Sequence, residues 1–261
     1  LGQQVVVDNR GPLLAGEAAS KAPPDGYTLL VSGGVLWISP LLRKTSYDVM
    51  SDFSPISLLV REINVLVVHP SVPVKSVKEL IALAKARPGE LNYASTATAS
   101  TAHLAGELFK SMAGVSILHI PYKGTGPAIS ALVSGEVQLA VFDTGVVVPQ
   151  LKSGKLRALA ITSAGPSALT PGLPTIAASG LPGYEMESMT GLFAPGRTPV
   201  AIVNRLHQEV IRVLNQPDVK QRYLNAGSEI VGSSPEQFAA AVKADMGRLG
   251  KVIKDAGIKV D

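Results

Sequence analysis

The sequence contains no cysteine, which excludes disulfide bridges, thiolate metal ligands and a cysteine nucleophile. Charged residues make up only 17% of the 261 residues, so the chain is not of the disordered, highly charged class. Aromatic residues are also scarce, at 5%, and the Lys and Arg residues are scattered. Because nucleic-acid-binding proteins concentrate basic residues on one stripe, we expect no nucleic-acid partner. No apolar run reaches the length of a membrane span.

Hydrophobic residues are abundant, at 46%, and 25 glycines and 19 prolines are spread along the chain. This content is enough to bury one large core or two modest ones. The spread of glycine and proline favours a fold with many short connections. The net charge of +4 is compatible with an anionic ligand.

Strand-like and helix-like segments alternate along the chain. Several strand candidates are continuous apolar runs, as the buried strands of parallel sheets are. The expected strands are residues 5–8, 27–33, 65–70, 91–95, 117–122, 137–143, 156–162 and 191–195. The expected helices are residues 76–87, 100–113, 126–135, 198–216 and 234–257, two of which begin with a capping box. The alternation predicts an α/β fold with parallel sheets.

The chain has neither an internal repeat nor a linker of biased composition. Two lobes would therefore be joined by ordinary crossover strands, for which the candidates are Ser95–Ser100 and Ser188–Leu192. This predicts a discontinuous first lobe, residues 1–97 and 190–261, and an inserted second lobe, residues 98–189.

The segment from Tyr93 to His103, YASTATASTAH, carries the strongest indication of a binding site. A strand ends there in small hydroxyl residues and a helix begins at once. In α/β folds the ligand crevice lies outside the carboxyl ends of the strands, and the first turn of a helix offers free N–H groups and a positive dipole end. A carboxylate or phosphate fits such a site, with the hydroxyls of Ser95, Ser100 and Thr101 as further donors. An ordinary Ser/Thr helix cap explains the same residues equally well.

Further positions could face the same ligand. Lys123–Pro127 is a Gly-rich stretch that opens another helix, although it could be only a turn. Ser32 and Asp143 both end strand patterns, and Asp143 could either hold a ligand group or cap the next helix. Neither of the common phosphate-loop patterns is present. Trp37, the only tryptophan, could line the site or belong to the core.

The four histidines match no zinc-binding spacing, so we expect no metal site. Two of them fall in strand patterns and one on an amphipathic helix, whereas His103 lies in the first turn of the candidate anion site. A triad of Ser100, His103 and Asp143 is conceivable, but the sequence lacks a Gly-x-Ser-x-Gly nucleophile elbow.

A series of short motifs runs through the whole chain in a fixed order. The motifs are Val5–Arg10, Ala22–Leu30, Glu79–Lys85, His103–Phe109, Pro121–Gly124, Ser153–Ala160, Pro174–Thr175, Gly180–Gly183 and Gly191–Pro195. This ordered series resembles the tripartite tricarboxylate transporter receptors, the Bug family of extracytoplasmic solute-binding proteins.

The resemblance implies a type II periplasmic binding protein fold, in which two lobes each hold a central, mostly parallel sheet and the ligand cleft lies between them. It implies an exported, periplasmic receptor, expected to be a monomer, that delivers a small carboxylate to membrane transporter subunits. No cofactor and no catalytic step would be involved. By position, the ligand contacts would come from Ser32, Ser95, Ala99, Ser100, Thr101, His103 and Asp143. Two alternatives stay open: an enzyme acting on a small carboxylate, and a ligand-sensing regulatory domain of the same fold.

The sequence departs from the family pattern in two places that bear on the site. The family begins with a strand, a Pro-Gly-Gly loop and a helix before the stretch that Leu1–Gln4 matches. We therefore expect a unit of on the order of thirty residues, including a ligand-contacting loop, to belong upstream. The family's Ser-x-Gly-x-Gly-Ser turn is Ser95–Ser100 here, with Ala97 and Ala99 in place of glycine, so the backbone can approach a ligand less closely.

Overall fold

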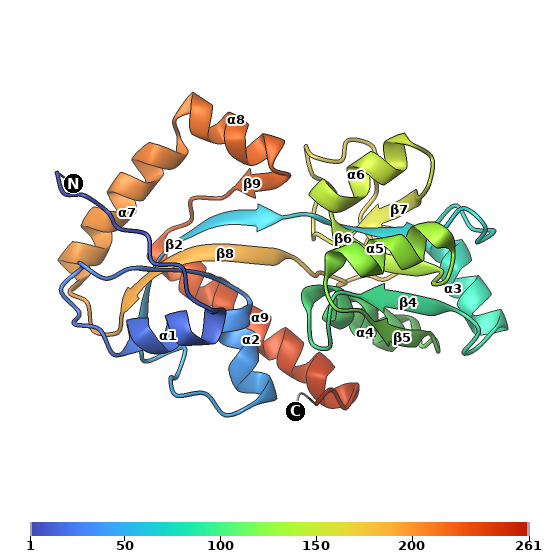
Figure 1. The fold of residues 1–261 in the computed structure, drawn as a ribbon, viewed down its shortest axis with the longest axis horizontal. Coiled ribbons are helices and arrows are strands. Elements are labelled where there is room, and N and C mark those ends of the chain that lie inside the picture. Colours follow the sequence, from blue (N-terminus) through green and yellow to red (C-terminus); the bar gives the residue numbers. More distant parts are fainter. Residues whose placement is uncertain (1, 260–261) are drawn as a thin grey trace. The chain divides into compact units, whose positions relative to one another are not determined.

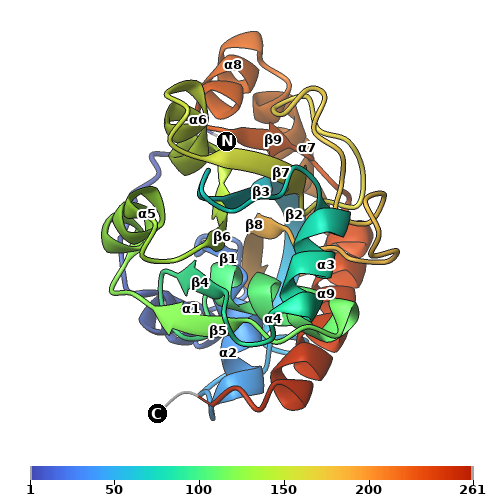
Figure 2. The same ribbon diagram turned by 90° about the vertical axis from the view of Figure 1, so that its right-hand side faces the viewer.

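The structure, a computed structural model, describes residues 2–259 and divides into two compact units (Figures 1 and 2). Unit 1 comprises the described residues up to Arg61 together with Met189–Asn225 and Glu229–Lys251. Unit 2 comprises Glu62–Ser188, Ala226–Ser228 and the described residues from Val252 onward. Each unit holds one β-sheet with helices packed on it, which confirms the α/β class.

Unit 1 is built on a four-stranded sheet in the order β1-β8-β2-β9. Its strands are β1 (Leu30–Gly33), β2 (Phe53–Glu62), β8 (Ser188–Pro195) and β9 (Ser228–Ile230), and β1 runs antiparallel to β8. Helices α1 and α2 pack against β1. The helices of this part of the chain are α1 (Pro12–Ser20), α2 (Val35–Leu42), α7 (Val200–Leu214), α8 (Pro217–Asn225) and α9 (Pro235–Asp255).

The core of unit 1 is centred on three fully buried aromatic rings. Trp37 lies with its ring centroid 6.4 Å from that of Phe193, and Phe193 lies 4.7 Å from Phe238. The indole Nε1–H of Trp37 donates to Asp245 Oδ2 at 2.7 Å, so its one polar atom is satisfied inside the core. Of the two roles considered for Trp37, the structure therefore supports the core role.

Unit 2 is built on a five-stranded sheet in the order β5-β4-β6-β3-β7. Its strands are β3 (Asn64–Val68), β4 (Asn92–Ser95), β5 (Leu118–Pro121), β6 (Leu139–Asp143) and β7 (Arg157–Ile161). Strands β5, β4 and β6 are parallel to one another, whereas β3 runs antiparallel to both β6 and β7. The expectation of mostly parallel sheets is thus corrected, because both units contain antiparallel pairs.

Helices cover both faces of the unit 2 sheet. On one face Val65 and Val67 of β3 belong to a core that includes Ala128 and Leu132 of α5. On the other face Leu66 lies near residues of α4. This double cover explains why β3 is apolar at nearly every position. The helices of this part are α3 (Val77–Ala86), α4 (Thr101–Ala113), α5 (Thr125–Ser134) and α6 (Thr144–Lys152).

The first division between the units differs from the expected one. It falls at Arg61/Glu62 rather than at 97/98, because β3 and β4 both pair with β6 and so belong to the unit 2 sheet. The second division, at Ser188/Met189, falls next to the expected position. The expected strand at residues 5–8 is not formed: Val5, Val6 and Val7 are largely exposed, and no strand of the described residues pairs with them.

Candidate functional site

The N-termini of three helices lie at one edge of the unit 2 sheet. Each of the mutually parallel strands β4, β5 and β6 leads directly into a helix, α4, α5 and α6 respectively. Because the carboxyl ends of parallel strands meet at the same edge, these helix starts gather there. Two backbone hydrogen bonds tie the first two connections together: Tyr122 N–H donates to Ser95 O and Gly124 N–H to Thr96 O, both at 2.9 Å. The predicted anion segment and the Gly-rich stretch are thus neighbours.

Helix α4 begins as predicted at a serine cap. Ser100 has extended backbone angles, and its Oγ accepts from His103 N–H at 3.3 Å. Its carbonyl accepts the first intrahelical bond, from Leu104 N–H. The amides of Thr101 and Ala102 precede that bond and so have no acceptor within the helix. They point outward along the positive end of the helix dipole, where an anion is stabilised.

Helix α5 begins without a side-chain cap. Its N-cap is Gly124, whose φ of 101° lies in the region that favours glycine, and no side chain accepts from the first turn. Pro127 in that turn has no N–H, so the amides of Thr125 and Gly126 are the donors on offer. Lys123 is exposed immediately before them. This helix start is therefore open to an anion from solution.

Helix α6 begins at Asp143, which acts as its N-cap. Asp143 Oδ1 accepts from Val146 N–H at 3.0 Å, and Thr144 N–H donates to Ile63 O. Glu62 lies close by: burial raises the pKa of its carboxyl, and the neighbouring Asp143 carboxylate raises it further. This corner of the edge is acidic, and the first amide of α6 is already bonded to Ile63, so the corner suits an ammonium or hydroxyl group of a ligand better than a second carboxylate.

Three of the predicted ligand contacts lie in or beneath the loop that joins β4 to α4. Ser95 is fully buried, and its Oγ donates to Ala97 O at 2.9 Å and lies 2.6 Å from His119 Nε2. His103 is also buried, with 5% of its surface exposed, and its Nδ1 accepts from Ala99 N–H at 2.8 Å. These side chains make hydrogen bonds inside unit 2, and their contact with a ligand stays a prediction.

The other predicted residues fall in different places. Ser100, Thr101 and Asp143 are half-buried at the edge described above. Ser32 lies in β1 of unit 1, where it is paired with Gly191 and is half-buried. The structure thus brings together every predicted residue except Ser32 within unit 2.

A polar cluster that was not expected from the sequence lies under the same loop, with Tyr93, His103 and Glu107 buried. The ring of His119 stacks on that of His103, with centroids 3.8 Å apart and planes 7° from parallel. Tyr93 pairs with His119 across parallel strands, and its OH donates to Glu107 Oε1 at 2.6 Å. Lys110 Nζ lies 2.6 Å from the same carboxylate oxygen. The spacing of His103, Glu107 and Lys110 along one side of α4 is the sequence signal that could have revealed the cluster.

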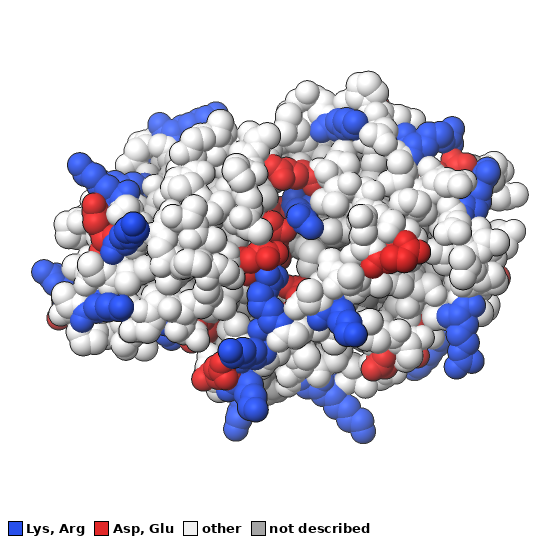
Figure 3. Space-filling view, turned by 180° about the vertical axis from the view of Figure 1, so that it is seen from behind, with Lys and Arg blue, Asp and Glu red and all other residues white. Residues whose placement is uncertain are grey.

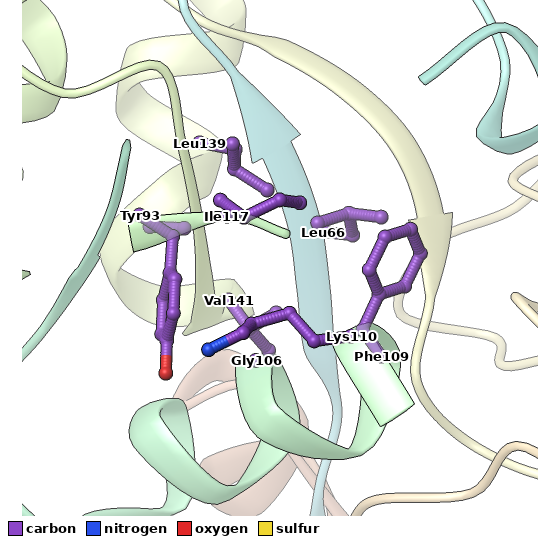
Figure 4. Close-up of a pocket in the computed structure, with 9 residues that line it drawn as sticks. Leu66, Tyr93, Gly106, Phe109, Lys110, Ile117, Leu139 and Val141 are labelled. Atoms are coloured by element: carbon purple, nitrogen blue, oxygen red, sulfur yellow. The ribbon is translucent and has the colours of Figure 1, made fainter. Parts of the chain in front are cut away.

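Two pockets of unit 2 differ from the site at the sheet edge. One is an apolar gap of about 10 Å³ between Tyr93, Phe109 and the sheet, room for a single water at most (Figure 4). The other has a volume of about 240 Å³ and is lined by two acidic residues and one lysine, so it does not favour an anion. Its lining residues are Glu107, Lys110, Ser111, Val115, Asp255 and Ala256.

The surface charges form no single patch on the face shown in Figure 3, where Lys and Arg alternate with Asp and Glu. Within residues 2–259, no group of three His, Asp or Glu side chains is placed to hold a metal ion. None of the helices in this range is both long and apolar enough to cross a membrane.

Comparison with known proteins identifies the class of the chain. A model of the family described as tripartite tricarboxylate transporter family receptor matches residues 1–258. The chain belongs to this family. The matched family and its solved neighbours are solute-binding receptors rather than enzymes, as the motif series indicated.

Individual relatives agree with the family assignment. BugT of Bordetella pertussis is 35% identical over 266 residues, which covers 100% of this chain and 82% of BugT. The structure of R. palustris Rpa4515 with adipate is 39% identical with a TM-score of 0.81, covering 99% of this receptor and 88% of that chain. MatC from Rhodopseudomonas palustris with bound malate is 31% identical with a TM-score of 0.74, covering 92% and 84%. These likenesses confirm the expected fold family.

Proposed function

We propose that this receptor binds a small organic carboxylate in the periplasm and delivers it to a tripartite tricarboxylate-type membrane transporter. The observation that carries the proposal is the pair of first-turn amides at the start of α4 and of α5, which begin after hydrogen-bonded neighbouring connections of unit 2. The amides of Thr101, Ala102, Thr125 and Gly126 supply neutral donors there, and Lys123 supplies a positive charge. The positive ends of two helix dipoles, at connections joined by backbone hydrogen bonds, stabilise an anion without any bound metal.

The relatives support the choice of carboxylate over phosphate. The two structures named above contain adipate and malate, both dicarboxylates. A carboxylate has two oxygens in one plane, which can accept from neighbouring amides of one helix turn. The contact expected from the hydroxyl of Ser32 stays a prediction.

An enzyme acting on the same carboxylate gains no support from the geometry. His103 would have to act as the base, but it is buried and its Nδ1 is occupied by Ala99 N–H. Asp143 serves as a helix cap rather than as a partner that orients this ring. Ser100 Oγ accepts from a backbone amide, and within residues 2–259 no base is hydrogen-bonded to it. We therefore propose binding without turnover.

A thermal-shift screen tests the proposal. Adipate, L-malate and citrate would be compared with adipamide and malamide, which match the first two in shape but carry no negative charge. At a concentration far above the Kd, a bound carboxylate should raise the Tm by several degrees, while the amides leave it unchanged. The ligand should be recovered chemically intact. Equal shifts with the amides, or conversion of the carboxylate to a product, would contradict the proposal.

A further inference from the structure

The β4–α4 loop contains a residue in an unfavourable backbone conformation. Ala99 has a φ of 62°, which places it in the left-handed region. There the Cβ of an L-residue crowds the following carbonyl oxygen, so residues other than glycine, asparagine and aspartate adopt it seldom. Only one other non-glycine residue within 2–259, Arg197, has a positive φ. Some contact must therefore hold Ala99 in place.

That contact is the hydrogen bond from Ala99 N–H to Nδ1 of His103, at 2.8 Å. The acceptor nitrogen must be unprotonated, so the neutral ring carries its proton on Nε2. The bond spans from the loop to the first turn of α4. Because Ala99 lies only two residues before the first residue of α4, fixing the amide of Ala99 also fixes the direction of the amides that follow it, Thr101 and Ala102.

A second histidine holds the other half of the loop. Ser95 Oγ donates to the carbonyl of Ala97, which can only accept, so its single proton is used there. The 2.6 Å contact between Ser95 Oγ and His119 Nε2 is then a bond in which the imidazole donates. His119 in turn lies flat against His103 at 3.8 Å. The two stacked rings lie beneath the loop, with His103 buried and His119 half-buried.

We propose that His103 is a positioning residue, which keeps the β4–α4 loop in the conformation that aims its amides at the carboxylate. This role rests on the proposed function. Replacing His103 leaves the amides that would bind the ligand in the chain. It would therefore change the affinity through the conformation of Ala99. A receptor whose loop is already ordered loses less conformational entropy on binding and so has the higher affinity.

The charged and titratable groups around the ring are compatible with its neutral form. Glu107 and Lys110 face it from α4, Tyr93 from β4 and His119 from β5. Glu107 Oε1, which lies 3.9 Å from His103 Nε2, is already held by Tyr93 and Lys110. Burial lowers the pKa of His103, an effect larger than the opposing effect of Glu107. The acceptor nitrogen therefore stays available at neutral pH.

The test compares two replacements of His103 in the full chain. His103→Asn places a carbonyl oxygen near the position of Nδ1 and can still accept from Ala99 N–H. His103→Phe preserves an aromatic ring against His119 but has no acceptor. Phe109→Leu is the matched control, because Phe109 is equally buried in α4 and has no bond to the loop. If His103→Phe does not fold, the smaller His103→Leu replaces it.

Two readouts separate the positioning role from a general loss of stability. The first is the hydrogen-exchange rate of the Ala99 amide without ligand, measured by NMR. The second is the Kd for whichever of adipate, L-malate or citrate raises the Tm of the wild type most. In His103→Asn we expect slow exchange of the Ala99 amide and a Kd within about twofold of the wild-type value. In His103→Phe we expect fast exchange and a Kd about tenfold higher than that of the wild type, as for loss of one hydrogen bond. Phe109→Leu should lower the Tm and change neither readout.

Several results would overturn the role of His103. One is a Kd and an Ala99 exchange rate in His103→Phe equal to those of the wild type. Another is a folded His103→Asn variant that binds as weakly as His103→Phe, since the acceptor would then be irrelevant. If the wild type binds no carboxylate at all, the proposed function fails and the positioning role fails with it. A failure of the proposed function is distinguishable from a failure of the His103 bond itself, because the exchange rate of the Ala99 amide is measured without ligand.

Discussion

The imidazole rings of His103 and His119 stack face to face at 3.8 Å, although one belongs to α4 and the other to β5. Each ring is bonded to a different point of the loop between β4 and α4, through Ala99 N–H and Ser95 Oγ. Two positive charges at this separation would repel strongly in a buried setting. The pair therefore couples the stability of unit 2 to pH.

Acid should destabilise the receptor through His119. Burial, reinforced by the neighbouring His103, lowers the pKa of His119 to about 4 in the folded protein. The unfolded chain takes up this proton near the ordinary pKa of about 6.5. The contribution of neutral His119 to the free energy of unfolding is therefore complete above pH 6.5 and is lost as the pH falls toward 4. We expect a loss on the order of 2 kcal/mol from this residue after allowing for solvent screening, measured by urea unfolding at a series of pH values.

The matched control is His119→Gln. Its amide N–H can still donate to Ser95 Oγ but does not titrate. The free energy of unfolding of this variant should fall less between pH 7 and pH 4.5 than that of the wild type. Identical pH dependence in the two proteins would show that His119 is not the responsible group.

Two serine caps allow an effect on carboxylate binding to be separated from an effect on protein stability. Ser100 caps α4 at the proposed site, whereas Ser76 caps α3 away from it, accepting from Glu79 N–H at 3.2 Å. Replacing either serine with alanine should cost about 1 kcal/mol of stability. Only Ser100→Ala should weaken carboxylate binding, by several-fold in isothermal titration calorimetry. An equal change in Kd for Ser76→Ala would argue against the site.

A positive charge beside the start of α5 should strengthen binding. Lys123 is exposed next to the free amides of Thr125 and Gly126, and Lys155 is equally exposed in the turn after α6. We expect Lys123→Gln to raise the Kd for a dicarboxylate a few-fold, and the effect should shrink in 0.5 M salt because surface charges are screened. Lys155→Gln serves as the control with the same change in net charge. A salt-independent effect, or one shared by Lys155→Gln, would exclude a specific role for Lys123.

The close approach of α4 to β4 depends on a glycine. A Cβ at Gly106 would overlap the ring of Tyr93, which lies directly against this side of the helix (Figure 4). Gly106→Ala should therefore cost about 3 kcal/mol, as overpacked core substitutions do. Gly247→Ala, in α9 with open space around the new methyl group, should instead stabilise by about 0.5–1 kcal/mol. Chemical unfolding of both variants checks the contrast, and a neutral Gly106→Ala would contradict this packing.

Local signals in the sequence predicted the elements that begin with a cap or form an apolar run. The Ser76 and Ser100 caps marked α3 and α4 to within a residue. Strand β2 was missed, since Pro55 and the two charged residues at its end interrupt its apolar pattern. Residues 5–8 resemble a strand by composition, but a strand also needs a hydrogen-bonded neighbour, which composition does not reveal.

The candidate site was predictable in its location but not in the role of each residue. The hydroxyl-rich turn after β4 correctly marked a helix start at the sheet edge. The burial of Ser95 and His103 could not be foreseen, because it depends on His119 from a strand that lies next to β4 only in the folded protein. The expected position of the first division between the units differs from the observed one for a similar reason. Only the pairing of β3 and β4 with β6 shows that these strands belong to unit 2.

The most direct test of carboxylate binding at the helix starts is an NMR titration of ¹⁵N-labelled receptor with adipate, L-malate and citrate, using adipamide and malamide as controls. Binding at the helix starts predicts that the amide resonances of Thr101, Ala102, Thr125 and Gly126 shift together and saturate with one carboxylate ligand. The uncharged amides should leave them in place. Saturable binding that shifts other residues and leaves these four unchanged would contradict it.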